Sequence, residues 1–276
     1  MQHVHPPGMS IVPLEIQRAL VDEMGMTFNR LDLALHLAWT DTRTRYRRSV
    51  LGPFWLVIGT LIGVGGLGLV WSVVFQVDRE TLIPMMATGL VIWTLLSASI
   101  TEAASVFYTQ RELFLNLPTA SLFVSVVLLF RQLINFAHNL VVVVIVLLIY
   151  PRHLSLNALL VIPALALVAL NLLWLIQFIG YVGARYRDLA PLLVAIMQPL
   201  FFVTPVLFQP QQLGSFRFIA EINPLAQWLT LIRDPLTGSA PPAMSWIASG
   251  CMALVGWSLA LLITAVKRKR LVYWVH

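Results

Sequence analysis

Residues 120–149, ASLFVSVVLLFRQLINFAHNLVVVVIVLLI, decide the fold class, because this stretch is apolar almost throughout and Arg131 is its only charged residue. A helix needs about 20 apolar residues to cross the hydrocarbon core of a bilayer. This stretch exceeds that length, so we expect its helix to be tilted, bent or extended beyond the bilayer. A soluble domain cannot shield so long an apolar run from water, and the chain is therefore predicted to be a membrane protein.

The rest of the chain repeats this pattern. Of its 276 residues, 59% are hydrophobic and 11% are charged, whereas about a quarter of the residues in an ordinary soluble domain are charged. Apolar segments that could cross a membrane occur at 53–76, 82–106, 120–149, 158–183, 190–208 and 244–266. They predict an all-α membrane protein with six transmembrane helices.

The basic residues predict how these helices are oriented. One set of connections holds Arg43, Arg45, Arg47 and Arg48 before the first segment, Arg111 after the second, Arg185 and Arg187 after the fourth, and four residues at 267–270 after the last. The alternate connections hold Arg79, Arg152, Arg217 and Arg233. Because Lys and Arg are enriched in cytoplasmic connections, we expect both termini to be cytoplasmic.

The segments outside the spans have distinct compositions. Four parts are expected: an N-terminal cytoplasmic tail at 1–27, an amphipathic interface helix at 28–48, a six-helix transmembrane domain at 49–266 and a cytoplasmic tail at 267–276. One face of the second part carries Phe28, Leu31, Leu35 and Trp39, as is typical of a helix in the membrane interface. The connection 209–243 mixes prolines with short apolar pieces, which predicts external helices that form a gate.

Several classes of function lack the residues that they need. Lys267 and Lys269 are the only lysines, and neither completes the GxxxxGK[ST] pattern of a phosphate-binding loop. No paired carboxylates or metal-spaced histidines occur, and His3 and His5 fit a polar tail. We therefore expect no catalytic residue, no metal site and no cofactor in this chain. No cleaved signal peptide is expected either, because the first thirty residues contain no continuous apolar region.

The third apolar segment carries a polar face. Arg131, Asn135 and His138 recur at helical spacing, so they share one side of the helix for about two turns. An unpaired guanidinium in a bilayer costs at least about 2.5 kcal/mol, so Arg131 must face protein or water. Two interpretations follow. Either the face makes hydrogen bonds between helices, for example with Glu102 of the second segment, or it forms the wall of a hydrated conduit.

Three short motifs together resemble one family. They are RYRRSVLGPFW at 45–55, LP at 117–118 and ARYRDLAPLL at 184–193. They resemble the ABC-2 type permeases of polysaccharide exporters, which carry O-antigen, teichoic acid, capsule or galactan, and the likeness extends from Leu31 to about Lys269. One departure is Thr119, which stands where a basic residue often follows the proline.

This resemblance implies an ABC-2 exporter fold of the type V-like class in the bacterial cytoplasmic membrane. It implies a homodimer with two copies of a separate ABC ATPase, which would hold ATP and Mg²⁺. The ATPase contacts would lie at 109–118 and 185–190, with Arg111, Glu112, Asn116, Arg185, Arg187 and Asp188 as the coupling residues. The headgroup of a lipid-linked substrate would enter beside Arg43, Arg45, Arg47 and Arg48.

The aromatic residues leave two interpretations open. Trp residues near span ends are typical of interfacial belts. Aromatic rings also stack on sugar faces, so Trp71, Trp93 and Phe130 are conduit candidates together with Arg131, Asn135 and His138. We expect export of an undecaprenyl-linked polysaccharide. The alternatives are an ABC-2 permease for a drug or small lipid, a membrane enzyme acting on polyprenyl-linked sugars, and an ion-coupled transporter.

Overall fold

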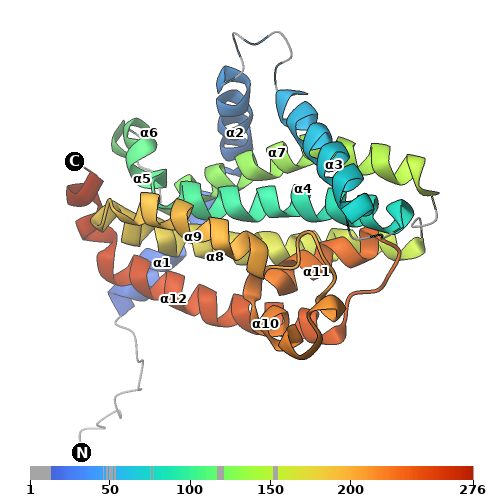
Figure 1. Ribbon diagram of the computed structural model, residues 1–276. Coiled ribbons are helices and arrows are strands. Elements are labelled where there is room, and N and C mark those ends of the chain that lie inside the picture. Colours follow the sequence, from blue (N-terminus) through green and yellow to red (C-terminus); the bar gives the residue numbers. More distant parts are fainter. Residues whose placement is uncertain are drawn as a thin grey trace, which may run out of the picture.

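The computed structural model describes residues 14–45, 54–74, 78–116, 121–151 and 155–275, together with positions 47, 49, 52 and 76. Every regular element in this part of the chain is a helix, which confirms the predicted all-α class (Figure 1). Five helical stretches are long and apolar enough to cross a membrane. They are α3 (Phe54–Val74), α4 (Arg79–Ala103), α7 (Ser121–Ile149), α8 (Val161–Arg185) with the preceding 3₁₀ turn η2 (Leu156–Leu160), and α12 (Ala243–Val275).

The predicted count of six spans is not confirmed, because the described residues contain five helices of sufficient length. The fifth apolar segment forms α9 (Leu189–Val203), which has 15 residues and is shorter than a usual span. The helix ends early because Thr204 precedes Pro205 and has an extended ψ of 136°. A residue before proline is disfavoured in helical conformation, so the helix ends there and residues 205–208, which are apolar, lie outside it.

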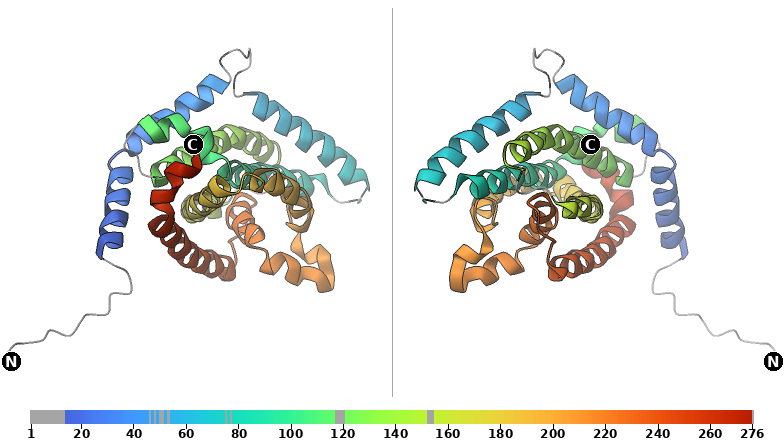
Figure 2. Two further views of the ribbon diagram at one scale, coloured as in Figure 1. Left: turned by 90° about the vertical axis from the view of Figure 1, so that its left-hand side faces the viewer. Right: turned by 90° about the vertical axis from the view of Figure 1, so that its right-hand side faces the viewer.

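The long helices lie side by side, and Figure 2 views the bundle along them. Helix α4 is the central one: it packs against α3, α7, α8, α9 and α11, and 78% of its apolar window is buried. Helix α3 lies at the edge of the bundle, steeply inclined to the others, with 22% of its window buried. The core therefore forms around α4, while most of α3 is left for lipid or another protein.

The bundle has two ends, which we call the α6 end and the α11 end. The α6 end holds α5 (Val106–Thr109), α6 (Arg111–Asn116), the turn at 186–188 and the last turns of α12 (Figure 1). The α11 end holds η3 (Pro210–Phe216), α10 (Arg217–Ile222) and α11 (Pro224–Leu236). The expected short helices in the connection 209–243 are thus present, with Asn223 capping α11 through a hydrogen bond from Leu225 N (3.0 Å).

The segment before the first span forms two helices, α1 (Leu14–Phe28) and α2 (Leu31–Arg45), whereas a tail at 1–27 and one helix at 28–48 were predicted. Both run across the direction of the long helices (Figures 1 and 2). Helix α1 forms because it has a docking face: Glu23 and Thr27, one turn apart, are both buried.

The segment 267–276, which was predicted as a tail separate from the last span, is helical up to Val275. Helix α12 continues through it to Val275, because Leu271 and Val275, again one turn apart, pack into the core. Burial of two apolar side chains on one face is enough to keep this stretch helical, because the lysines and arginines around them are good helix formers.

Close helix contact at the α6 end depends on glycine. A Cβ on Gly183 of α8 would lie 2.1 Å from the carbonyl oxygen of Ala104, just before α5. The same face of α8 carries Gly180, where a Cβ would lie 2.8 Å from the Phe107 ring. Helix α8 therefore passes directly against the turn that leads into α5 and α6, and a side chain at Gly183 would push the two apart.

Candidate functional site

A cluster of charged side chains joins three helices near the α6 end. Arg131 of α7 pairs with Glu102 of α4, and its Nη1 lies 3.6 Å from Asp41 Oδ2 of α2. Arg45 Nη2 lies 3.9 Å from Glu102 Oε2, and Gln110 Nε2 donates to Asp41 Oδ2 (3.0 Å). The Arg131 side chain is 14% exposed, so these carboxylates compensate a charge that has lost most of its water.

This cluster bears on the two interpretations of the α7 polar face. The contact between Arg131 and Glu102, which the first interpretation proposed, is present. Farther along, Thr60 of α3 donates to Asn139 Oδ1 (2.9 Å), whose amide donates to the Asn135 carbonyl oxygen (3.1 Å). The His138 ring stacks on Trp39 of α2, with centroids 6.4 Å apart. The polar face of α7 is therefore covered by α2 and α3 in this structure.

The other conduit candidates are divided between three places. Phe130 packs in a small apolar cluster with Ala34 and Ala38 of α2. Trp71 is half-buried against the main core. Trp93 lies elsewhere, in a groove between α4 and α9. The six predicted conduit residues thus do not line one cavity within the described part of the chain.

The groove between α4 and α9, which we call the aromatic groove, has a volume of about 580 Å³. Its rings are Trp93, Phe201 and Phe202; the Trp93 and Phe201 rings meet edge to face, with centroids 5.5 Å apart. Polar but uncharged side chains lie between the rings: Ser97, Thr101 and Gln198. No charged residue is among the described residues that line it. Such a groove offers flat apolar faces beside hydrogen-bonding groups.

A second buried polar cluster at the α6 end was missed by sequence reasoning. Glu23 of α1, 2% exposed, accepts hydrogen bonds from the Ser121 hydroxyl and from Leu122 N (3.1 Å) at the start of α7. Its other oxygen lies 3.6 Å from Arg268 Nε of α12. A carboxylate at a helix N-terminus is favoured by the helix dipole, so Glu23 attaches α1 to both α7 and α12.

This cluster extends into α8. Gln177 Nε2 donates to Ser121 Oγ (2.9 Å) and Thr264 Oγ1 (3.0 Å), and its Oε1 accepts from Ser125 (2.6 Å). The hydroxyls of Ser121 and Tyr181 lie 2.9 Å apart. Gln177 is a polar residue inside a long apolar segment, and that was the one available signal.

The predicted ATPase contacts lie at the α6 end. Arg111 and Glu112 are exposed on α6, and Arg185, Arg187 and Asp188 are exposed around the turn between α8 and α9. The Arg185 guanidinium lies 5.8 Å from the Trp274 ring of α12, so this turn is held against the last turns of α12. The Asn116 side chain lies outside the described residues.

The predicted headgroup residues follow α2. Arg43 and Arg45 are exposed in its last turn, and Arg47 is exposed just beyond it, whereas Arg48 lies outside the described residues. The same helix exposes Leu35 (52%) and Trp39 (51%). The interfacial position expected for this helix stays a prediction.

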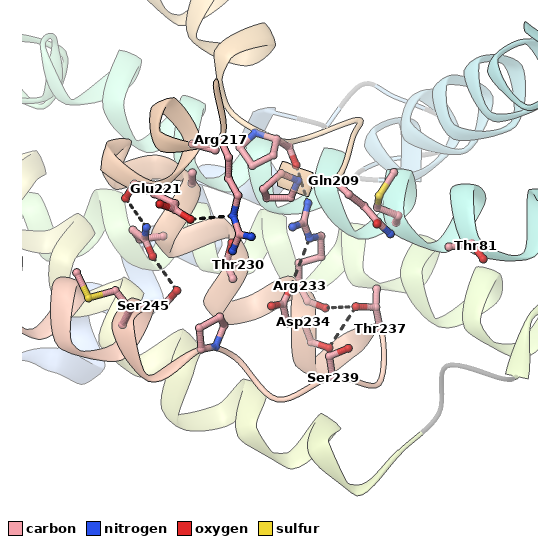
Figure 3. A pocket seen from close by; sticks show the side chains of 18 residues that line it. Thr81, Gln209, Arg217, Glu221, Thr230, Arg233, Asp234, Thr237, Ser239 and Ser245 are labelled. Carbon is pink, nitrogen blue, oxygen red and sulfur yellow. Dashed lines mark hydrogen bonds and ion pairs between the residues drawn. The ribbon is translucent and has the colours of Figure 1, made fainter. Parts of the chain in front are cut away.

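At the α11 end, α10, α11 and the starts of α4 and α12 surround a polar pocket of about 660 Å³, the α11 pocket (Figure 3). Arg233 is 5% exposed; its Nη1 donates to the Pro205 carbonyl oxygen (2.6 Å) and its Nε lies 3.6 Å from Asp234 Oδ1. Burial raises the pKa of Asp234, and the neighbouring Arg233 charge opposes that shift.

These features define a multi-pass helical membrane protein whose polar sites lie between and beside its spans. The model of the ABC-2 type transporter family matches residues 33–236, and the chain belongs to this family. It is similar to an O-antigen export system permease protein RfbA from Klebsiella pneumoniae, at 22% identity over 74% of this chain and 79% of the relative. It is also similar to the protein of that name from Myxococcus xanthus, at 25% identity over 72% of this chain and 77% of the relative.

Proposed function

We propose that this chain is the membrane subunit of an ATP-driven exporter that moves a lipid-linked polysaccharide out of the bacterial cytoplasm. Two copies would form the channel, together with two copies of a separate ABC ATPase. Family membership supports transport, and the names of the relatives support a glycan as cargo. The observation that carries the proposal is the aromatic groove between α4 and α9.

The groove suits a sugar chain better than a drug or a small lipid. Sugar rings have apolar faces that stack on aromatic rings, and hydroxyls that bond to groups such as those of Ser97, Thr101 and Gln198. The hydroxyls of Ser97 and Thr101 already donate to carbonyl oxygens of α4, and their lone pairs can still accept hydrogen bonds from sugar hydroxyls. An acyl chain or an apolar drug could use neither these acceptors nor the Gln198 amide. The groove is open on one side, so a second copy of the chain would be needed to enclose a glycan within it.

The α6 end would be cytoplasmic and would contact the ATPase. It carries the exposed charged residues of α6 and of the turn at 186–188, and the sequence contains no phosphate-binding loop of its own. The arginines at the end of α2 would attract the pyrophosphate of an undecaprenyl-linked substrate, since each basic residue near an anionic membrane surface contributes about 1 kcal/mol. The α11 end would face the periplasm, with α10 and α11 as the outer gate.

The first experiment is depletion of this chain in its native host, followed by measurement of lipid-linked glycan on the two leaflets of intact spheroplasts. We expect accumulation on the cytoplasmic leaflet and loss from the outer leaflet. An unchanged distribution would overturn the polysaccharide assignment and leave the drug or small-lipid permease.

A pair of variants tests the role of the groove. Trp93→Leu removes the ring and part of the apolar bulk, whereas Trp93→Phe keeps a flat aromatic face. If the groove holds sugars, export should fall strongly in the first variant and recover in the second, with equal amounts of folded protein. Equal export by the two variants would exclude stacking at Trp93.

A separate experiment tests the energy source. Transport by the purified chain alone, driven by an ion gradient without ATP, would support the ion-coupled alternative instead of an ATP-driven exporter.

A further inference from the structure

The α11 pocket has the size and construction of a ligand site. Its volume of about 660 Å³ falls within the roughly 300–1,000 Å³ typical of small-molecule sites. Its walls come from the start of α4, the segment after α9, α10, α11 and the start of α12, and Figure 3 shows their side chains converging on the cavity. The chain folds back on itself here, so the pocket is formed by a single copy.

The charged residues of the pocket cancel in pairs. Among the described lining residues the charges are two arginines and two carboxylates. Arg217 Nε lies 2.8 Å from Glu221 Oε1, and Arg233 Nε lies 3.6 Å from Asp234 Oδ1. A phosphate would have to break one of these pairs or bind without a net attractive field, and a metal cation would meet the same obstacle. The pocket is therefore suited to an uncharged ligand.

Uncharged polar groups supply the remaining contacts. Thr81, Gln209, Gln227, Thr230, Thr237, Ser239 and Ser245 all line the cavity. Some are fixed in advance: Ser245 Oγ donates to Gln227 Oε1 (2.7 Å), and Gln227 Nε2 donates to the Glu221 carbonyl oxygen (2.6 Å). Thr230 lies half-buried on the pocket side of α11 and its hydroxyl makes no hydrogen bond to the described residues (Figure 3). A ligand rich in hydroxyl groups would satisfy it.

We propose that the α11 pocket binds an uncharged sugar unit of the glycan at the outer end of the path. This inference rests on the proposed function, and it narrows the substrate to a neutral polysaccharide, as opposed to a phosphate-containing one such as teichoic acid. The pocket would hold the leading sugar after it leaves the uncharged aromatic groove. Both sites would then select against charge along the glycan itself, while the arginines at the α6 end would meet the charge of its lipid pyrophosphate.

The test uses the full-length chain in nanodiscs, with binding followed by saturation-transfer NMR. The two probes are a neutral galacto-oligosaccharide and a glycerol-phosphate oligomer of similar length. We expect binding of the neutral oligomer and at least tenfold weaker binding of the anionic one. Tighter binding of the anionic oligomer would overturn the proposal, and so would failure of both to bind. This comparison needs no variant, so it stands even if a substitution prevents folding.

Two variants place the binding in the pocket. Thr230→Val removes the unpartnered hydroxyl while keeping the shape, and it should weaken binding of the neutral oligomer roughly three- to tenfold. The control is Ser258→Ala on α12, whose hydroxyl bonds to the Leu254 carbonyl of its own helix (2.8 Å) and lines no part of the pocket. Equal affinity of the two variants would mean that the sugar binds elsewhere, contrary to the proposal.

Measurement of export in cells distinguishes failure of the α11 pocket proposal from failure of the proposed export function. If glycan still moves to the outer leaflet but the purified chain binds neither oligomer, the pocket proposal fails and the proposed function stands. If depletion leaves the glycan distribution unchanged, the proposed function fails whatever the pocket binds.

Discussion

The two ends of the bundle both carry ion pairs, but these pairs connect different parts of the chain. At the α6 end the partners come from distant parts of the chain: Arg131 pairs with Glu102 and Asp41, and Glu23 pairs with Arg268. At the α11 end the partners are adjacent or one turn apart, as in Arg233 with Asp234 and Arg217 with Glu221. The ion pairs of the α6 end link helices to one another, whereas those of the α11 end stay within single helices. The buried Arg233 is joined to another segment by its hydrogen bond to the Pro205 carbonyl oxygen (2.6 Å).

This difference has a mechanical consequence. A displacement of α1, α2 or α7 at the α6 end must move its partners or break a buried ion pair, so these helices should move as one unit. Helices α10 and α11 would keep their ion pairs if they shifted. The contacts that such a shift would cost are apolar packing of α11 and the hydrogen bond from Arg233 to the Pro205 carbonyl oxygen. This suits a cytoplasmic end that transmits motion from an ATPase and an outer end that opens as a gate, as the proposed function requires.

The largest effect is expected from Arg131→Leu. It removes the guanidinium that pairs with Glu102 and Asp41, and removing one partner of a buried pair costs about 3–5 kcal/mol. Because Glu102 is 31% exposed, water offsets part of this loss. We therefore expect the free energy of unfolding, measured in detergent, to fall by about 2 kcal/mol. The double variant Arg131→Leu with Glu102→Leu should recover part of it. Loss of transport in a protein of unchanged stability would favour the conduit role for Arg131.

A comparable effect is expected from Gly183→Ala. The new methyl group would meet the Ala104 carbonyl oxygen at 2.1 Å, and backbone cannot move aside as a side chain does. Overpacking of this kind costs about 1–3 kcal/mol, measured by unfolding in detergent. The control is Gly66→Ala on α3, where no atom lies within 4 Å of the added Cβ. If both variants lose the same stability, close contact between α8 and the turn before α5 does not matter.

An intermediate effect is expected from Glu23→Gln. The amide oxygen can still accept from Ser121 and Leu122 N, but the charge that faces Arg268 is lost. Hydrogen bonds to a charged acceptor are stronger than those to a neutral one by about 1 kcal/mol. Helix α1 should therefore detach more often, and limited proteolysis within α1 should become faster. Unchanged protection would show that Glu23 does not hold α1 in place.

Much of the architecture could be predicted because it depends on local composition. Long apolar runs are sufficient for the spans, and the cost of burying Arg131 required a partner, of which Glu102 was the one suggested. The short helices after α9 followed from prolines placed between apolar pieces.

What could not be predicted depends on contacts between distant residues or on single backbone positions. Glu23 lies in a mixed polar segment, and its partner Ser121 is 98 positions away. The early end of α9 depends on one dipeptide, Thr204–Pro205. The α11 pocket is assembled from five separate stretches of chain, and none of them carries a motif. The conduit candidates on α7 were predicted from one helix alone, so the covering helices α2 and α3 could not be foreseen.

The smallest effect is expected from Arg217→Gln at the α11 end. The ion pair between Arg217 and Glu221 joins residues four apart on one short helix, and both side chains are more than half exposed. Pairs of this kind contribute about 0.3–0.5 kcal/mol and are screened by salt. The loss in the free energy of unfolding in detergent should therefore be severalfold smaller than that of Arg131→Leu. A loss as large as that of Arg131→Leu would mean that α10 is attached to the bundle through this charge, and the contrast between a linked α6 end and a movable α11 end would fail. A small loss that disappears at high salt would instead show that this charge does not attach α10 to the bundle, as an outer gate needs.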